Sequence, residues 1–154
     1  DGIRDDLVTG VQTCALPISV TDRYRQEWAA NGGDPDGLPL MGLTRHIVIA
    51  ENREEAWAVG RRAYKPWRAA FMRLWDRAGI PLPNFTLPNE FDDFAAEGKA
   101  IVGTPDEVAS EVEVQIAESG INYFLCRFAF GDITLDEATR SLGFFKARGL
   151  GIPK

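Results

Sequence analysis

Ile101-Val102-Gly103-Thr104-Pro105-Asp106-Glu107-Val108-Ala109 is the stretch that decides the fold, because it predicts a tight turn followed by a capped helix. Thr104 is a good N-cap, since its hydroxyl can accept a free backbone N–H, and Pro105 needs no N–H in the first helical turn. Glu107 stands three residues after the cap and completes a capping box. Apolar residues then recur every four positions and predict one buried stripe, formed by Val108, Val112 and Ile116.

The residues that follow this helix predict a buried strand. Gly120 can take the left-handed conformation that ends a helix. The next run, 121–128, is apolar on both faces apart from Asn122 and Arg127. Such a run is typical of a strand in a parallel sheet that is covered on both faces.

Composition and charge describe one modest globular domain. The chain has 154 residues, of which 45% are hydrophobic and 26% are charged. The net charge of −6 disfavours nucleic acid and anionic membranes as main partners, and no apolar run is long enough to cross a membrane. Two cysteines, Cys14 and Cys126, are too few for a disulfide framework, so a reduced, cytoplasmic setting is expected. The single histidine, His46, excludes a multi-histidine metal site, and no metal is expected.

The first residues are expected to lie outside the folded domain. Residues 8–18 resemble a translated short-read sequencing adapter, which implies that residues 1–18 are artefactual and disordered and that the domain comprises residues 19–154. No helical or strand period persists through this segment. A secretory signal peptide is the alternative, but Asp5 and Asp6 stand where such a leader carries positive charge.

Helices and strands alternate along the rest of the chain. The expected order is a helix at 21–30, a turn at 34–37, a strand at 44–50, a helix at 52–65, a short helix at 90–97, the capped helix and strand quoted above, and a helix from Thr134 to Gly149. Pro66 either kinks the helix that it follows or starts a second one, which ends at Gly79. This order predicts an α/β fold with parallel strands and right-handed crossovers. Two strands cannot make a self-sufficient covered sheet, so we expect the chain to be the end of a larger protein whose upstream part is missing.

Over about residues 20–148, the chain resembles the C-terminal part of the bacterial-luciferase-like, flavin-dependent monooxygenases. The pieces that carry the resemblance, in order, are 45–56, 101–108, 120–124, 127–132 and 137–142 with Phe145. The resemblance implies the C-terminal portion of a (β/α)8 TIM barrel that is incomplete on its own. It implies an enzyme that oxidises a small organic substrate with O2, using reduced FMN supplied by a flavin reductase, or deazaflavin F420. It also implies a homodimer for the full-length protein, and an isolated fragment that is inactive.

Two places in the sequence fall where such barrels hold their active sites, at the carboxyl ends of the strands. Glu51 and Asn52 follow the first strand, and Arg127, Phe130 and Asp132 end or follow the second. Arg127 is suited to hold a phosphate or a carboxylate bidentately, and Phe130, or its neighbour Phe128, is suited to pack on a flavin ring or an apolar substrate. The alternative is that Arg127 pairs with a nearby carboxylate and that the phenylalanines belong to the core. No residue is identified as catalytic.

Other chemically apt residues have plainer interpretations. The helix start at 103–105 can bind an anion, but acidic residues already occupy its first turn, which favours simple capping. His46 is expected at the start of a strand, the end remote from a barrel's active face. Cys126 is expected to be a buried structural thiol. Basic residues interleaved with aromatic ones are expected to form a solvated face rather than a nucleic-acid surface: Arg61, Arg62, Lys65 and Arg68.

The sequence therefore leaves two candidate functions. The first is a fragment of a flavin-dependent oxidoreductase, and the second is a non-catalytic α/β interaction domain that shares only the barrel-end architecture. An apolar stripe on the helix after Pro66 is expected to pack internally or against a second subunit: Phe71, Leu74 and Trp75. The length of the uninterrupted gene separates the two functions, because the enzyme needs further βα units upstream.

Overall fold

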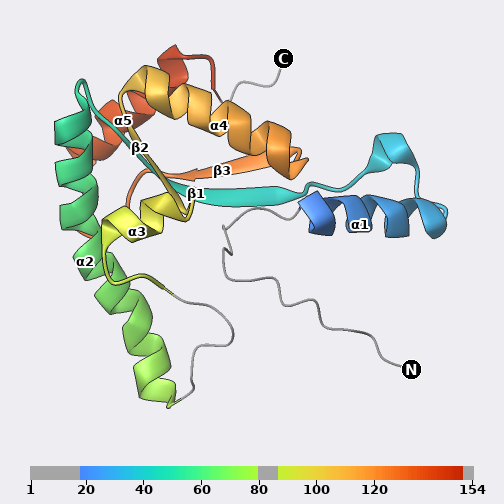
Figure 1. Cartoon of the computed structure of the whole chain (residues 1–154), viewed down its shortest axis with the longest axis horizontal. Coiled ribbons are helices and arrows are strands. Elements are labelled where there is room, and N and C mark those ends of the chain that lie inside the picture. The colour runs from blue at the N-terminus through green and yellow to red at the C-terminus, as the bar shows by residue number, and fades with distance from the viewer. Residues whose placement is uncertain (1–17, 80–86, 151–154) are drawn as a thin grey trace.

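The computed structural model describes residues 18–79 and 87–150. The expectation of a disordered leader therefore lies outside the described residues, except at Ile18, which begins the first helix. The elements in chain order are α1 (Ile18–Ala30), a 3-10 turn (Pro35–Gly37), β1 (Gly42–Ile49), α2 (Arg53–Ala78), α3 (Phe91–Ala96), β2 (Ala100–Gly103), α4 (Pro105–Ser119), β3 (Tyr123–Arg127) and α5 (Leu135–Ala147). Figure 1 shows α4 and α5 on one side of the strands and α3 on the other.

The three strands form one parallel sheet in the order β2-β1-β3. The expected parallel α/β arrangement is confirmed, but the expectation of only two strands is wrong, because Ala100–Gly103 pairs with His46–Ile49 of β1. That stretch reads as a turn in the sequence because it has only four residues and ends in glycine. In a plain barrel, consecutive strands are neighbours. Here β1 and β3 lie side by side, and β2 is added at the other edge of β1.

The two faces of β1 belong to two different apolar clusters. On one face, Ile47 and Ile49 pack with Val108 and Val112 of α4 and with Phe145 of α5. On the other face, Val48 and Ala50 pack with buried residues of α2 and α3 and of the segment after β3, namely Ala56, Ala63, Tyr64, Phe91, Phe94 and Phe130. The sheet is therefore covered on both faces along the carboxyl half of β1.

β3 is an edge strand that is covered on one face only. Its burial alternates, with Tyr123 48% exposed and Leu125 38% exposed, whereas Phe124 and Cys126 pack against the α4 and α5 side. The expectation of a strand covered on both faces is therefore wrong for β3 in the described part of the chain. Apolar residues at alternate positions predict burial only if another element covers them.

The predicted helix boundaries agree with the structure where local capping sets them. Thr104 and Glu107 form the expected capping box, Asn52 caps α2, and Gly79 and Gly120 end their helices in the left-handed conformation. α2 is one helix of 26 residues with Pro66 inside it, so Pro66 does not start a second helix.

The predicted stripe on α4 is wrong at its last position, because Ile116 is 37% exposed. Gln115 and Ser119 are buried in its place. The reason is Arg45 of β1, which is 4% exposed and donates from its Nε to Gln115 Oε1 at 2.7 Å. A buried guanidinium requires a hydrogen-bond acceptor, so a polar side chain displaces the apolar one.

Candidate functional site

His46 and Arg127 form a polar pair between β1 and β3. They are direct partners in the parallel register, and Arg127 Nη1 lies 3.2 Å from His46 Nε2. Since a guanidinium has only donors, His46 Nε2 must accept this hydrogen bond. The imidazole proton therefore sits on Nδ1, in agreement with a hydrogen bond between the ring and the Lys99 backbone.

Aromatic rings enclose the His46 imidazole. The ring centroids of Trp67, Phe130 and Phe94 lie 4.5, 4.6 and 5.2 Å from that of His46, all at steep interplanar angles. Burial among these rings, and next the charge of Arg127, lower the pKa of His46 to about 4, against an opposing effect of the Lys99 hydrogen bond. His46 is thus a neutral acceptor at pH 7.

The expected position of His46 is wrong. β1 begins at Gly42 rather than Thr44, so His46 is the fifth residue of an eight-residue strand. It lies beside Arg127, which is the last residue of β3. The sequence shows a single histidine within a predicted strand. It does not show the pairing with Arg127, because that pairing depends on the strand register.

The other two predicted site residues lie in different surroundings. Phe130 is 6% exposed and belongs to the apolar cluster around α2 and α3, where its ring contacts His46. Asp132 is exposed and pairs with Arg62 of α2 at 3.1 Å. The structure thus brings Arg127 and Phe130 together through His46, and it gives Asp132 a partner on a helix. The functional role of each of these residues stays a prediction.

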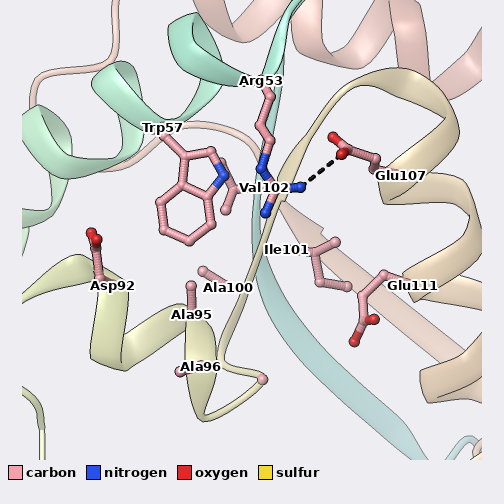
Figure 2. Close-up of a pocket in the computed structure, with 11 residues that line it drawn as sticks. Arg53, Trp57, Asp92, Ala95, Ala96, Ala100, Ile101, Val102, Glu107 and Glu111 are labelled. Atoms are coloured by element: carbon pink, nitrogen blue, oxygen red, sulfur yellow. Dashed lines mark hydrogen bonds and ion pairs between the residues drawn. The ribbon is translucent and has the colours of Figure 1, made fainter.

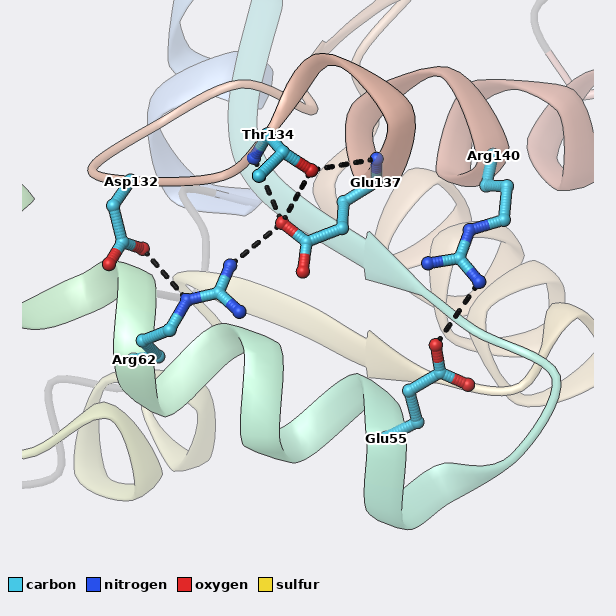
Figure 3. A network of polar contacts seen from close by, with 6 residues as sticks. All are labelled: Glu55, Arg62, Asp132, Thr134, Glu137 and Arg140. Carbon is cyan, nitrogen blue, oxygen red and sulfur yellow. Dashed lines mark hydrogen bonds and ion pairs between the residues drawn. The ribbon is translucent and has the colours of Figure 1, made fainter.

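Figure 3 shows how the segment after β3 is tied to α2. Arg62 donates to Asp132 Oδ1 and, at 2.7 Å, to Glu137 Oε2, while Glu137 also closes the capping box of α5 with Thr134. The hydrogen bond from Arg62 is the main cause that lowers the pKa of Glu137 to about 2. This network fixes the loop that carries Phe130 toward His46.

Of the two positions predicted after β1, Asn52 has a structural role and Glu51 lies at the surface. Asn52 Oδ1 accepts the Glu55 backbone N–H at 2.8 Å as the cap of α2, and Glu51 is exposed. Glu55 pairs with Arg140 of α5 at 3.3 Å (Figure 3). These contacts stabilise the turn at the carboxyl end of β1.

A pocket of about 420 Å³, which the sequence did not indicate, lies beside β2. Figure 2 shows residues that line it. Three consecutive residues of β2 line it, Ala100, Ile101 and Val102. Since side chains alternate between faces, such a run lines a cavity through the edge of the strand. Trp57 forms another wall. The guanidinium carbons of Arg53 and Arg61 lie 5.7 and 5.2 Å from a ring centroid of Trp57. The only signal in the sequence was the spacing of Arg53, Trp57 and Arg61, which follow one another at intervals of four residues on one helix.

The amino end of α4 is not an open anion site. Glu107 Oε2 accepts from the Thr104 backbone N–H at 2.9 Å, and Glu107 Oε1 accepts from Arg53 at 2.7 Å. These hydrogen bonds lower the pKa of Glu107, so its carboxylate occupies the place that an anion would take. The plain capping interpretation holds.

Several arginines of α2 also have partners within the molecule. Arg61 makes two hydrogen bonds of 2.7 Å to Asp92, and Arg68 binds the Pro88 carbonyl at 2.7 Å and Asn89 Oδ1 at 2.6 Å. Within the described ranges, no group of three or more side chains is arranged to hold a metal ion. In the same ranges, no helix is both long enough and apolar enough for a transmembrane span.

Comparison with known sequences identifies a curated relative. No protein-family model matches the chain. A protein of Sinorhizobium fredii (strain NBRC 101917 / NGR234), named "Uncharacterized protein y4wF", is 33% identical over 129 residues, which are 84% of this chain and 37% of that protein. The chain therefore spans little more than a third of the length of this curated relative.

Comparison with solved structures identifies the fold. Monooxygenase RslO1 from Streptomyces bottropensis matches with a TM-score of 0.68 and 23% identity, over 90% of this chain and 36% of that one. Long-chain alkane monooxygenase LadA matches with a TM-score of 0.56 and 18% identity, over 86% and 34%. The apo form of MsnO8 matches with a TM-score of 0.50 and 18% identity, over 79% and 38%. The chain has the parallel α/β fold of about a third of a luciferase-like TIM-barrel monooxygenase, so the expected fold class is confirmed.

Proposed function

We propose that the chain is part of a flavin-dependent oxidoreductase of the luciferase-like class, which oxidises a small organic substrate with O2. The observation that carries this proposal is the match to the monooxygenase RslO1 over 90% of the chain, combined with a polar group at the carboxyl end of β3. Barrel enzymes hold their active sites at that end of the strands. The chain is expected to be inactive alone, because it spans only 36% of the matched structure.

The described residues fit part of a reduced flavin. Arg127 supplies a cation, and the exposed face of β3 supplies apolar surface beside it through Tyr123 and Leu125. A planar ring that carries negative charge needs both kinds of surface. The amino end of α4 offers no site for the flavin phosphate, since the Glu107 carboxylate fills it.

The flavin, when bound, would supply the reaction with dioxygen. The chain's own residues would hold and orient the bound group and exclude water from one side of it. The apolar clusters at the carboxyl half of β1 suit the exclusion of water, and Arg127 suits orientation. FMN and deazaflavin F420 are both compatible with these residues. A separate flavin reductase, a homodimeric assembly and a cytoplasmic location belong to the same proposal.

Flavin titration tests the proposal. The protein expressed from its complete reading frame should quench FMN or F420 fluorescence with saturable binding, and should consume O2 when reduced flavin and a substrate panel are supplied. A protein that is folded by circular dichroism but binds neither flavin would contradict the proposal. That outcome would favour the second candidate, a non-catalytic α/β interaction domain.

A further inference from the structure

We propose that Arg127 and His46 form an oxyanion-recognition point for an organic ligand with an apolar body, in which Arg127 binds the anion and His46 positions Arg127. The inference rests on the proposed function only in placing the ligand at the carboxyl end of β3. The anion can be the phosphate of a flavin nucleotide or the carboxylate of an organic substrate. Both present the same chemistry to a guanidinium.

The hydrogen bond between the two side chains orients the guanidinium. Arg127 uses its Nη1 to donate to His46 Nε2, which leaves its other N–H groups for a ligand, as far as the described residues show. The three aromatic rings around His46 and the hydrogen bond to Lys99 hold the imidazole in place. A planar donor fork held in one orientation binds carboxylate and phosphate better than a mobile one, because less conformational entropy is lost.

The charge of Arg127 is not neutralised by its neighbours. Four arginines on nearby helices each hold a carboxylate: Arg53, Arg61, Arg62 and Arg140. Arg127 instead faces a neutral imidazole, and no carboxylate of the described ranges forms an ion pair with it. A cation without a counter-charge at the carboxyl end of a strand is suited to an incoming anion.

The surface beside Arg127 selects an apolar body for the ligand. Side chains of a strand alternate between faces, so Tyr123, Leu125 and Arg127 share one face of β3. Thr44, the partner of Leu125 in the register, lies on that face as well. Tyr123 and Leu125 are 48% and 38% exposed there. An anionic head at Arg127 with an aromatic or aliphatic body over Leu125 fits this arrangement.

Two matched ligand pairs test the anion site in the protein expressed from its complete reading frame. FMN is compared with riboflavin, which lacks the phosphate, and benzoate is compared with benzamide, which lacks the charge. Calorimetric titration should show that Arg127→Gln weakens the anionic member of one pair by about tenfold or more and changes its neutral member by less than about twofold. The pair that responds identifies the source of the anion. Arg73→Gln, at an exposed arginine of α2, is the matched control and should change neither pair.

The role of His46 is tested by two substitutions. His46→Phe keeps a ring but removes the acceptor, and should reproduce the selective loss seen with Arg127→Gln. His46→Gln retains an acceptor toward Arg127 and should restore most of the selectivity, which a merely structural role would not require. Arg127→Lys, which keeps the charge and loses the planar fork, serves if Arg127→Gln does not fold, and should lose part of the selectivity.

The outcomes separate this inference from the proposed function. If Arg127→Gln leaves both affinity ratios unchanged, the anion site is refuted, whether or not flavin binds. If His46→Phe retains the ratios of the wild type, or if His46→Gln loses them as fully as His46→Phe, the positioning role is refuted. If the protein binds neither flavin but binds benzoate through Arg127, the proposed function fails and the anion site stands.

Discussion

Ser141→Ala should strongly destabilise the protein, because Ser141 completes the hydrogen bonding of β1. Ser141 Oγ accepts the Ile49 backbone N–H at 2.7 Å and donates to the Ile49 carbonyl at 3.0 Å. The backbone N–H groups of alternate residues of β1, such as His46 and Ala50, donate to carbonyls on the β2 side. The backbone N–H and C=O of Ile49 point to the opposite edge of β1, where β3 pairs only as far as His46. A serine of α5 therefore replaces the missing strand partner.

The size of the effect follows from burial. Ser141 and Ile49 are each 4% exposed, so water cannot readily replace the lost hydroxyl. Leaving a buried backbone group without a partner costs about 1–3 kcal/mol, and Ile49 would have two such groups. Alanine returns about 0.5 kcal/mol through its better helix propensity. Two such groups, less the gain in helix propensity, give an expected fall in the free energy of unfolding of about 2–5 kcal/mol.

Urea denaturation of the wild type, Ser141→Ala and Ser110→Ala measures this loss. Ser110 is an exposed serine of α4, so its substitution carries the same gain in helix propensity without breaking a buried hydrogen bond. The difference between the two variants isolates the bridge to Ile49. A difference below about 0.5 kcal/mol would refute the reasoning, because it would mean that other groups or water satisfy Ile49.

Three further predictions concern the loop after β3 and its surroundings. Gly131→Ala should lower the melting temperature by several degrees in differential scanning fluorimetry, since Gly131 has φ +59° and an added Cβ would collide with the Ala63 carbonyl; an unchanged melting temperature would show that the loop moves freely. Glu137→Gln should make the free energy of unfolding depend less steeply on pH at acidic pH. The folded-state pKa of Glu137 is about 2, below its usual value, so its ionised form contributes stability that is lost as pH falls from about 5 to 2; urea midpoints across that range that fall equally in both proteins would contradict this. Cys126 should react slowly with iodoacetamide at pH 8 in the folded protein, because burial raises the pKa of its thiol to about 11 and leaves roughly one thiolate in a thousand; rates equal to those in urea would disprove that burial.

The sequence predicts the features that depend on neighbours in the chain. The capping box of Thr104 and Glu107 was predicted correctly, because a cap and its partner lie three residues apart. β2 could not be predicted in the same way, since four residues carry too little pattern and its place is set by pairing with β1. The exposure of Ile116 likewise depends on a tertiary contact, the demand of buried Arg45 for a polar partner on α4. Errors arose where a residue's partner lies far away in sequence.

In the candidate site too, the sequence predicted a residue but not its partner from a distant part of the chain. Arg127 was predicted from its place at the end of an apolar strand, but its partner His46 lies 81 residues away and becomes adjacent only through the parallel register of β1 and β3. A shift of that register by one residue would turn one of the two side chains to the opposite face and break the pair. The register is held by apolar contacts on the covered face, where Phe124 and Cys126 pack near Ile47 and Phe145. The packing on one side of the sheet therefore sets the chemistry that is displayed on the other.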